Sequence, residues 1–525
     1  IVFNLILTVN YKSDNLTNIY YEIKREKMIF NNPIIRGYHP DPSICRANGK
    51  YYLVTSSFQY FPGVTLFESQ DLINWNQIGY CLTRKSQLEL DAVPSSCGIF
   101  APTIRYHKGR FYMTTTNIGA PNGNNFYVWT DDIYGEWSEP IYVEQGGIDP
   151  SLFFENERAY FMSNGVDGNG KSAILQCEID ISSGKQLTKS KPIWNGTGGR
   201  YLESPHLYKI NGYYYVMAAE GGTEYGHMVT YARSNSLWGP FEPYPDNPVL
   251  TNRNLGGYQI QGVGHADLVD DENGNWWLFH LGFRQMSQWM PFHHLGRETF
   301  LMPVDFKDGW FTVGQDGTTA AVVDTDRISD NVKQDIKKEF TFQNTSWDME
   351  WRFLRTVDKD NYVLGKNELS IKSSLDTLDK CGSPSFVGMH QKEFDMDLSV
   401  NVTANDGEAG ITMYMDENHH YDLAVCKDSD GYNVLLKLNI GDIKHIQTCI
   451  KLKSNEIKLR VRACPEYYEF FFIEDGIENQ LGRAQTRYLS SEVAGGFTGV
   501  VMGLYSQGGL GKTFNKFTDF ICRYK

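Results

Sequence analysis

The sequence has no run of about 18 apolar residues, so no part of it is predicted to cross a membrane as a helix. It also has little positive charge, because 49 lysines and arginines stand against 63 acidic residues and the formal net charge is −14. A nucleic acid or an anionic membrane would favour a basic face, and the charge balance argues against both as partners. A neutral or cationic ligand fits it better.

Cysteine is sparse and shows no pattern. The nine cysteines are odd in number, and no two of them form a C-x-x-C pair. A chain of 525 residues can bury large cores without disulfide bonds, and its length predicts at least two domains. The cysteines are therefore expected to be reduced, buried thiols.

The sequence has no convincing export signal at its start. Residues 1–8 are apolar, but no basic region precedes them and no small-residue cleavage site follows them. This pattern, with the odd number of cysteines, favours the cytoplasm, and secretion is the alternative. Residues 1–27, which end just before Met28, are expected to be an unstructured N-terminal extension.

A short motif recurs five times along the chain. Its first copy begins with Asp41-Pro-Ser-Ile and continues eight residues later with Gly49 and an aromatic run. The copies begin at Asp41, Ala101, Asp149, Ser204 and His265. A repeat of about 50 residues, in which two short aromatic or β-branched runs flank a turn, is typical of one blade of a β-propeller. Five copies predict five blades.

The first residues of the copies are expected to meet at one funnel, because radial repetition places equivalent positions around the axis. Asp41, Asp149, Glu203 (just before Ser204) and His265 would then converge. Two carboxyl groups, one protonated and one ionised, are the minimum for hydrolysing a glycosidic bond. A third can raise the proton affinity of the acid. Asp-Pro also opens many turns, but its recurrence at equivalent positions favours function over turn formation alone.

Aromatic and polar residues are expected around these carboxyl groups. They are Phe58, Phe100, Thr223, Glu224, Trp289 and Arg297. Sugar pockets use aromatic faces for the apolar side of the ring and charged hydrogen bonds for the hydroxyls, so this mixture fits a carbohydrate. His265 has three interpretations, as a metal ligand, as a sugar-binding residue or as a buried propeller histidine. A single histidine without spaced partners is a weak metal signature.

The second half of the chain has a different pattern. Residues 28–316 contain the repeats and are predicted to form the propeller, and the polar stretch 317–338 is predicted to be a linker. From residue 339 to 525, short segments alternate with period two and no long amphipathic helix interrupts them. The prediction is an all-β protein, a five-bladed β-propeller followed by a β-sandwich of the jelly-roll, lectin-like kind.

Several motifs resemble glycoside hydrolase family 43, and most closely its two-domain β-xylosidases. They are Arg36-Gly-Tyr-His-Pro-Asp-Pro-Ser-Ile44, Gly147-Ile-Asp-Pro-Ser-Leu152, Glu203-Ser-Pro-His-Leu-Tyr208 and Gly296-Arg-Glu-Thr299. The resemblance covers residues 30–525. It implies that Asp41 is the general base, that Glu203 is the general acid, and that Asp149 orients the acid and modulates its pKa.

The same resemblance implies the rest of the sugar site. Phe58, Thr223, His265 and Arg297 would shape subsite −1, and a sandwich loop within residues 497–505 would wall it. Phe100 departs from the family pattern, because many relatives have Trp or Tyr at its position. The family inverts configuration and requires no cofactor, although some members carry a divalent cation, often calcium, near the histidine that matches His265.

A pocket closed by a second domain would admit only a chain end. The resemblance therefore implies an exo-acting enzyme that releases xylose from the non-reducing ends of β-1,4-xylo-oligosaccharides. An α-L-arabinofuranosidase, or an enzyme with both activities, is the alternative, since both sugars present a similar five-carbon ring. A non-catalytic carbohydrate-binding propeller is the alternative from another class. The expected partner is a small oligosaccharide, and a homo-oligomer stays open.

Overall fold

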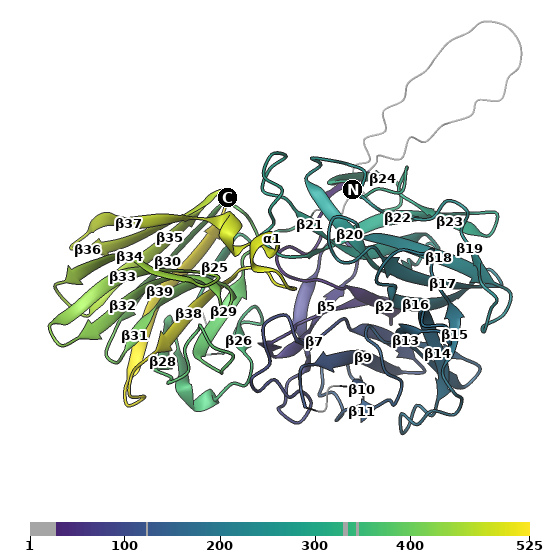
Figure 1. The fold of residues 1–525 in the computed structure, drawn as a ribbon, viewed down its shortest axis with the longest axis horizontal. Helices are drawn as coiled ribbons and strands as arrows, with labels where there is room; N and C mark the ends of the chain where they lie inside the picture. The colour runs from purple at the N-terminus through teal and green to yellow at the C-terminus, as the bar shows by residue number, and fades with distance from the viewer. Residues whose placement is uncertain (1–27, 122–123, 329–333, 343–345) are drawn as a thin grey trace, which may run out of the picture.

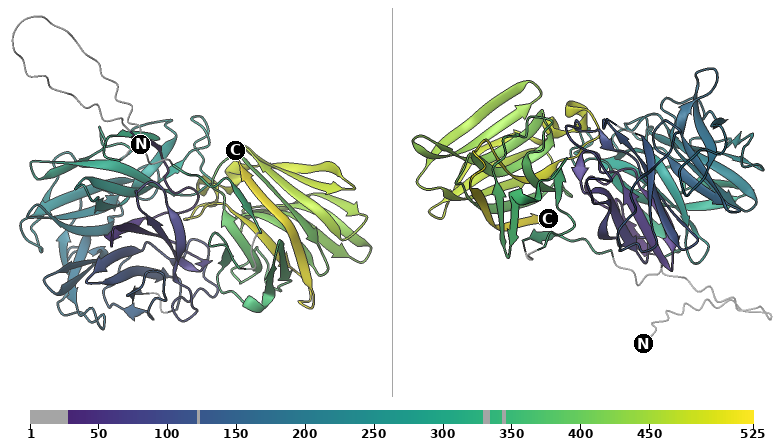
Figure 2. Two further views of the ribbon diagram at one scale, coloured as in Figure 1. Left: turned by 180° about the vertical axis from the view of Figure 1, so that it is seen from behind. Right: turned by 90° about the horizontal axis from the view of Figure 1, so that it is seen from below.

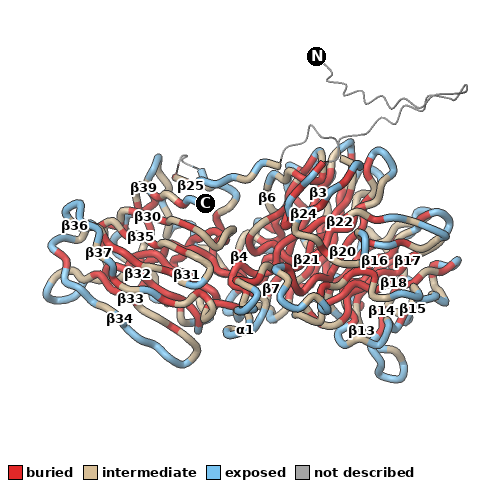
Figure 3. The backbone as a smooth tube through the Cα atoms, turned by 90° about the horizontal axis from the view of Figure 1, so that it is seen from above, coloured by how far each residue is buried: buried red, intermediate tan, exposed pale blue. Residues whose placement is uncertain are grey.

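The computed structural model describes residues 28–121, 124–328, 334–342 and 346–525, and the extension expected at residues 1–27 lies outside this part of the chain. The described chain forms two all-β domains that lie side by side, a propeller from its first part and a sandwich from its last (Figure 1). Both domains have a buried interior under an exposed rim of turns (Figure 3). Among the described residues, no helix is long and apolar enough to cross a membrane.

Five antiparallel sheets form the five predicted blades. The first contains β2 (Ser43–Ala47), β3 (Lys50–Thr55), β5 (Gly63–Ser69) and β6 (Asn76–Leu82), and the second β7 (Gly98–Ile99), β8 (Thr103–His107), β9 (Arg110–Ile118), β10 (Asn125–Thr130) and β11 (Ile141–Tyr142). The third contains β12 (Ser151–Glu155), β13 (Arg158–Val166), β14 (Ser172–Ile179) and β15 (Lys191–Trp194), and the fourth β16 (Glu203–Ile210), β17 (Tyr213–Glu220), β18 (Met228–Ser234) and β19 (Glu242–Pro243). The fifth contains β20 (Ile260–Asp270), β21 (Trp276–Arg284), β22 (Glu298–Lys307) and β23 (Trp310–Val313).

The turn of each repeat explains its fixed spacing. Between β2 and β3, Asn48 and Gly49 have φ angles of 53° and 74°. Two central residues with positive φ make the tight turn whose twist matches a β-hairpin, and Asn-Gly is the preferred pair for it. Lys108–Gly109 and Asn211–Gly212 have the same positive φ pattern in blades two and four. In these three repeats the glycine is therefore the second central residue of a hairpin turn, and Glu157 takes that position in blade three.

The C-terminal domain consists of two packed eight-stranded sheets. One contains β25 (Glu339–Thr341), β27 (Tyr362–Gly365), β28 (Glu368–Lys372), β30 (Met396–Thr403), β35 (Glu456–Ala463), β36 (Tyr467–Glu474), β37 (Ile477–Gln485) and β39 (Phe514–Tyr524). The other contains β4 (Tyr60–Phe61), β26 (Arg352–Leu354), β29 (Ser385–His390), β31 (Glu408–Asp416), β32 (His419–Asp428), β33 (Gly431–Ile440), β34 (Ile443–Leu452) and β38 (Val501–Gln507). Three short helices are η1 (Lys359–Asn361), η2 (Thr486–Leu489) and α1 (Ser491–Ala494).

The segment expected as a linker at residues 317–338 contains a strand. β24 (Val322–Thr325) pairs antiparallel with β1 (Met28–Asn31), so the end of the propeller returns to its beginning. Val323 and Phe30 are buried by this pairing, whereas Val322 is exposed. In the sequence, residues 317–338 looked like a polar linker because β24 has only four residues and only alternate ones face the core.

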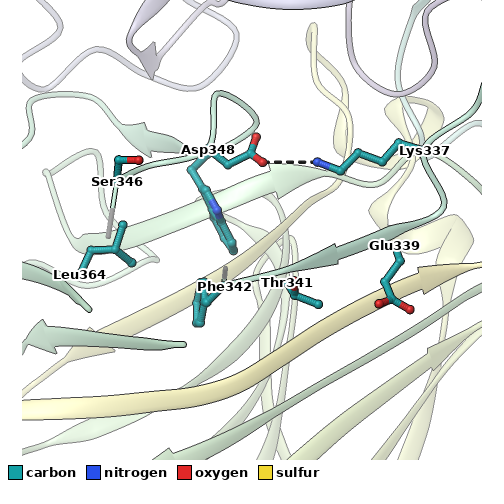
Figure 4. A pocket seen from close by; sticks show the side chains of 8 residues that line it. Lys337, Glu339, Thr341, Phe342, Ser346, Asp348 and Leu364 are labelled. Atoms are coloured by element: carbon teal, nitrogen blue, oxygen red, sulfur yellow. Dashed lines mark hydrogen bonds and ion pairs between the residues drawn. The ribbon is translucent and has the colours of Figure 1, made fainter. Parts of the chain in front are cut away.

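A small cavity lies where the chain enters the sandwich. It measures about 80 Å³ and is lined in part by Glu339, Phe342 and Leu364 (Figure 4). The ion pair between Lys337 Nζ and Asp348 Oδ2, at 3.3 Å, lies beside it. The polar side chains that line this cavity come from exposed ends of the segment that connects the two domains, and not from the motif residues.

The two domains are joined by shared secondary structure and by buried charges. β4, a strand of the propeller part of the chain, pairs with β26 and so extends a sandwich sheet. Arg355 of the sandwich is fully buried, forms an ion pair with Glu417 of the same domain, and donates from its Nε to the carbonyl oxygen of Val93 in the propeller at 2.5 Å. The views in Figure 2 show the domains in contact along one side of the propeller. The sandwich is thus fixed against the propeller rather than tethered to it.

A charged network ties several blades together near their inner strands. Asp267 of β20 accepts hydrogen bonds from Ser43 Oγ at 2.6 Å and from Tyr208 Oη at 2.6 Å, and Arg105 Nη1 lies 2.7 Å from its Oδ2. These partners come from β2, β16 and β8. Burial alone would raise the pKa of Asp267, but the Arg105 guanidinium holds it below its ordinary value. A single buried carboxylate therefore joins four blades.

We expect Asp267→Asn to destabilise the protein by about 3–5 kcal/mol, because it leaves the Arg105 guanidinium without its buried counter-charge. Thermal or urea denaturation of the purified protein measures the loss. Asp131→Asn is the matched control, since Asp131 pairs with Arg110 on the propeller surface and its removal should change little. Equal stability of the two variants would contradict the structural role of Asp267.

Candidate active site

The motif residues at the start of the repeats share an unusual backbone conformation. Asp41, Asp149, Ser204 and His265 have φ angles of 56°, 55°, 55° and 49°. Positive φ is uncommon for residues other than glycine and persists where the surrounding structure imposes it, often at functional sites. Near Glu203 and His265 the strand register also shifts, which re-aims side chains relative to the regular ladder. Ala101 of blade two is not among the positive-φ residues.

Asp41 is buried in an environment that favours its ionised form. Its Oδ1 accepts a hydrogen bond from Arg297 Nη1 at 3.0 Å, and its Oδ2 accepts one from the Ser56 hydroxyl. Burial alone would raise the pKa of Asp41, but the charge of Arg297, assisted by His265 and Ser56, holds it below its ordinary value. Asp41 is therefore a carboxylate at neutral pH.

Ser56 is a site residue that the motif analysis missed. The hairpin register pairs Ser43 with Val54, and its continuation by two residues places Ser56 opposite Asp41. The backbone N–H of Ser56 donates to the carbonyl oxygen of Pro40 at 3.2 Å, which fixes this position. Extending the predicted hairpin register beyond the strand ends would have found it.

The environments of Glu203 and Asp149 favour the protonated form of each carboxyl group, in contrast to the environment of Asp41. Burial, with the charge of Asp41 added, raises the pKa of Glu203 to about 7. Burial and the charges of Glu203 and Asp41 raise the pKa of Asp149 well above its ordinary value, although the Ser204 N–H donates to its Oδ2 at 3.2 Å. Two carboxyls that influence each other titrate as a pair. We infer that the pair keeps a proton under conditions in which Asp41 has lost its own.

Arg297 also organises the rest of the pocket. Its Nη1 donates to Thr223 Oγ1 at 3.0 Å, and its guanidinium lies 5.7 Å from the ring centre of Phe58 and 5.2 Å from that of Phe497. The ring centres of Phe58 and Phe100 are 5.5 Å apart. Thr223, Phe58 and Phe100, all expected around the site, are therefore assembled beside the carboxyl groups.

Phe497 brings the sandwich domain into this pocket. Its ring centre lies 5.9 Å from those of both Phe58 and Phe100. Its backbone is held by the propeller, because its N–H donates to Ser96 Oγ at 2.8 Å and its carbonyl oxygen accepts from the Tyr38 hydroxyl. The structure places Phe497, the first residue of the expected loop 497–505, at the pocket, whereas residues from Val501 onward form strand β38 rather than a loop.

Two residues expected near the pocket do not join it. Trp289 is 85% exposed, and Glu224 forms a surface ion pair with Arg200 at 2.8 Å. Both lie on loops between strands, where the register of the repeats gives no guide to side-chain direction. Their sequence proximity to motif residues was not sufficient to place them.

A second missed residue supports the segment before Glu203. Glu220, at the end of β17, is fully buried and accepts hydrogen bonds from the N–H groups of Thr197 and Gly199 at 2.8 and 2.6 Å. Thr230 Oγ1 donates to the same carboxyl group at 2.7 Å. Glu220 therefore fixes the loop that leads into Glu203. Glu220 precedes a Gly-Gly pair at a strand end, but no repeat signal distinguishes it.

His265 is buried beside Asp41, with its Nδ1 3.7 Å from Asp41 Oδ1. Burial lowers its pKa, so the imidazole is neutral. Calcium prefers six to eight oxygen ligands. Among the described residues, no group of three or more His, Cys, Asp or Glu side chains is placed to hold a metal ion. The described residues around His265 do not fit an ion bound directly by side chains.

The arrangement can perform acid–base chemistry on a sugar. One buried carboxyl group is kept ionised and two are kept proton-rich, which is the separation of pKa values that assigns a base and an acid.

Comparison with known protein families also indicates a glycosidase, because residues 30–311 match the model of glycosyl hydrolases family 43. The chain belongs to glycoside hydrolase family 43. Residues 339–522 match a beta-xylosidase C-terminal concanavalin A-like domain.

Relatives within this family extend over almost the whole chain. The family 43 protein described here is 37% identical to the non-reducing end alpha-L-arabinofuranosidase of Bacteroides ovatus over 489 residues, which cover 91% of each chain. It is 36% identical to a xylosidase/arabinosidase of Butyrivibrio fibrisolvens over 523 residues, which cover 94% of this chain and 98% of the relative. The solved structure of Bacteroides ovatus xyloglucan PUL GH43B superposes with a TM-score of 0.89 at 36% identity, covering 95% of this chain and all of the other. The family 43 protein is a glycosidase, and its substrate is a carbohydrate.

We expect Phe497→Ala to raise KM for an aryl glycoside by about tenfold, because the pocket loses an aromatic face that shields Arg297 and the sugar ring. Steady-state kinetics measure the change. Phe514→Ala, which alters a sandwich aromatic that contacts Lys372 instead, is the control and should keep the KM of the unaltered protein. Unchanged KM in Phe497→Ala would show that the sandwich does not contribute to the pocket.

Proposed function

We propose that this family 43 protein is an exo-acting β-xylosidase that releases xylose from the non-reducing ends of short β-1,4-xylo-oligosaccharides with inversion of configuration. The observation that carries the proposal is the opposite shift of pKa values at Asp41 and Glu203 in one buried pocket. An inverting glycosidase needs one ionised carboxylate to activate water and one protonated carboxyl group to assist the leaving group.

In the proposed mechanism Asp41 is the general base. Its carboxylate takes a proton from a water molecule as the water oxygen attacks the anomeric carbon. Glu203 donates its proton to the glycosidic oxygen as the bond from that oxygen to the anomeric carbon breaks. Asp149 and Glu203 disfavour simultaneous ionisation, so the pair retains a proton for the acid role of Glu203. Exchange with solvent returns the proton from Asp41 and reloads Glu203 for the next turnover.

Exo action is supported by the contribution of the sandwich to the pocket. Phe497 reaches the same aromatic group as Phe58 and Phe100, and its backbone is bonded to the propeller at both its N–H and its carbonyl oxygen. A wall fixed in this way closes one side of the funnel, which fits a chain end better than the middle of a polymer. We propose that the non-reducing sugar lies against this wall.

The alternative substrate is an α-L-arabinofuranoside. One relative is named an alpha-L-arabinofuranosidase and another a xylosidase/arabinosidase, and both align with almost the whole chain. Both sugars have five carbons and can present similar hydroxyls to Arg297 and Thr223. The match of the C-terminal domain to a beta-xylosidase domain favours the xyloside as the main substrate.

Hydrolysis of p-nitrophenyl β-D-xylopyranoside and p-nitrophenyl α-L-arabinofuranoside tests this choice. We expect kcat/KM for the xyloside to be higher by about tenfold or more, the effect of one well-placed hydrogen bond to a sugar hydroxyl. Glu203→Gln is the control, because it keeps the shape of the acid and removes its proton. A higher kcat/KM for the arabinofuranoside would move the main activity to debranching. Unchanged turnover of xylobiose by Glu203→Gln would remove Glu203 from the role of acid.

We expect a bell-shaped dependence of kcat/KM on pH with its optimum below pH 7. Activity falls at high pH as the Glu203–Asp149 pair loses its proton, near the pKa of about 7 for Glu203. It falls at low pH as Asp41 gains a proton, below the ordinary pKa of an aspartate. Arg297 lowers the pKa of both Asp41 and Glu203, so Arg297→Gln should move both limbs to higher pH. If both pH limits of activity are unchanged in Arg297→Gln, the assignment of Asp41 as base and Glu203 as acid is wrong.

A further inference from the structure

Within the described part of the chain, one arginine is buried between the two domains without a counter-charge. Arg352, in β26, is only 1% exposed. Its neighbour Phe353 packs in the sandwich core, and strand alternation turns Arg352 and Leu354 to the opposite face of the sheet. Leu354 packs there against Tyr60, which comes from the propeller part of the chain. The side chain of Arg352 therefore points into the layer between the domains.

The guanidinium of Arg352 has no acceptor among the described residues. Its Nε and Nη2 atoms are buried and make no hydrogen bond, and no described aspartate or glutamate forms an ion pair with it. The other buried arginines of this layer are different. Arg355 pairs with Glu417, and Arg284 pairs with Glu298 at 2.7 Å and with Glu393 at 2.6 Å. Arg352 therefore differs from Arg355 and Arg284, whose charges are compensated by carboxylates.

Several other polar atoms in the same layer also lack partners within the described chain. Both ring nitrogens of His390, Nδ1 of His39 and the hydroxyl of Tyr60 are buried and make no hydrogen bond. His390 is close to both of the others, with ring centres 5.3 Å from His39 and 6.0 Å from Tyr60. Arg352 pairs with Gly388 across β26 and β29, and His390 lies two residues further along β29, so the side chains of Arg352 and His390 share one face of the sheet.

Arg352, His390, His39 and Tyr60 share one chemical property, because each of these residues can donate a hydrogen bond. A neutral imidazole donates from one nitrogen, a tyrosine donates from its hydroxyl, and a guanidinium donates from every nitrogen and carries a positive charge. Burial of a charge without a partner is costly, and buried charges in proteins are paired. A cluster of unpaired donors around a buried cation is complementary to an anion.

We propose that Arg352, His390, His39 and Tyr60 form a binding site for a small monovalent inorganic anion of halide size, buried between the propeller and the sandwich. The ion must be small, because the four side chains are almost completely inaccessible to solvent and offer a larger anion no exposed surface. A cavity of about 710 Å³ reaches the same layer, and His39 and Lys392 lie in its wall. Of the four proposed residues, His39 is the one that lines this cavity, so an ion that enters from it would reach the site past His39.

The site lies behind the catalytic pocket. Tyr38 stacks on Phe58 at 5.7 Å and lies 5.5 Å from the ring centre of His390. The backbone N–H of His39 donates to the carbonyl oxygen of Arg297 at 3.0 Å. A bound anion would therefore neutralise Arg352 directly beneath residues that hold the sugar pocket, and it would stabilise the contact between the domains.

The first test is thermal denaturation of the full chain in chloride-free buffer, with sodium chloride replacing sodium gluconate at constant ionic strength. We expect the midpoint to rise by about 2–4 °C and to saturate, as for a ligand that binds only the folded state. Arg352→Met removes the charge and keeps an apolar stem, and its midpoint should not respond to chloride. Arg46→Gln, which removes a partly exposed cation paired with Asp270, should respond like the unaltered protein.

A crystal of the unaltered protein grown with sodium bromide provides a test that does not depend on the folding of any variant. We expect an anomalous bromide peak in contact with the Arg352 guanidinium and His390. Ordered water at this position without an anomalous signal would overturn the proposal, and so would a melting midpoint that is independent of chloride at constant ionic strength. An equal chloride response in Arg352→Met would also overturn it. None of these measurements depends on the sugar that the enzyme prefers.

Discussion

The pocket contains three carboxyl groups, of which Asp41 and Asp149 are buried and Glu203 is half-buried, and one guanidinium, that of Arg297, contacts Asp41 directly. Arg297 Nη1 donates to Asp41, and no described ion pair links it to Asp149 or Glu203. Burial raises the proton affinity of all three groups, and only at Asp41 do the opposing interactions prevail. The unequal distribution of positive charge therefore differentiates chemically similar side chains. The separation of base and acid follows from where Arg297 lies rather than from the identity of the residues.

Much of this arrangement follows from repetition in the sequence. The hairpin turn of each blade requires positive φ, so the glycines at Gly49, Gly109 and Gly212 set the spacing that made the blades visible. The innermost residues Asp41 and Asp149 are equivalent by that spacing, and the structure gives them nearly identical φ angles. Five blades and the sandwich were predictable because both depend on local periodicity. The convergence of the carboxyl groups was predictable because radial symmetry leaves one place for them to meet.

The parts that the sequence did not reveal depend on contacts between distant segments. Glu220 and Trp289 illustrate the difference, since one is fully buried beneath the loop before Glu203 and the other is 85% exposed. Neither has a repeat position that distinguishes it. The pairing of β4 with β26 was also hidden, because a two-residue strand has no periodicity. Ser56 is intermediate, since the hairpin register determines its place once the strand ends are known.

The sandwich domain completes the pocket and is bonded to the propeller at the same point. Phe497 faces the aromatic wall, and its backbone is held by Ser96 and Tyr38 of the propeller. The sheet that contains β38, which follows Phe497, also contains β4 from the propeller part of the chain. A displacement of one domain would therefore break backbone pairing and withdraw Phe497 together. Because the layer between the domains also buries Arg352, its stability depends on how that charge is neutralised, and the geometry of the sugar pocket depends on the same layer.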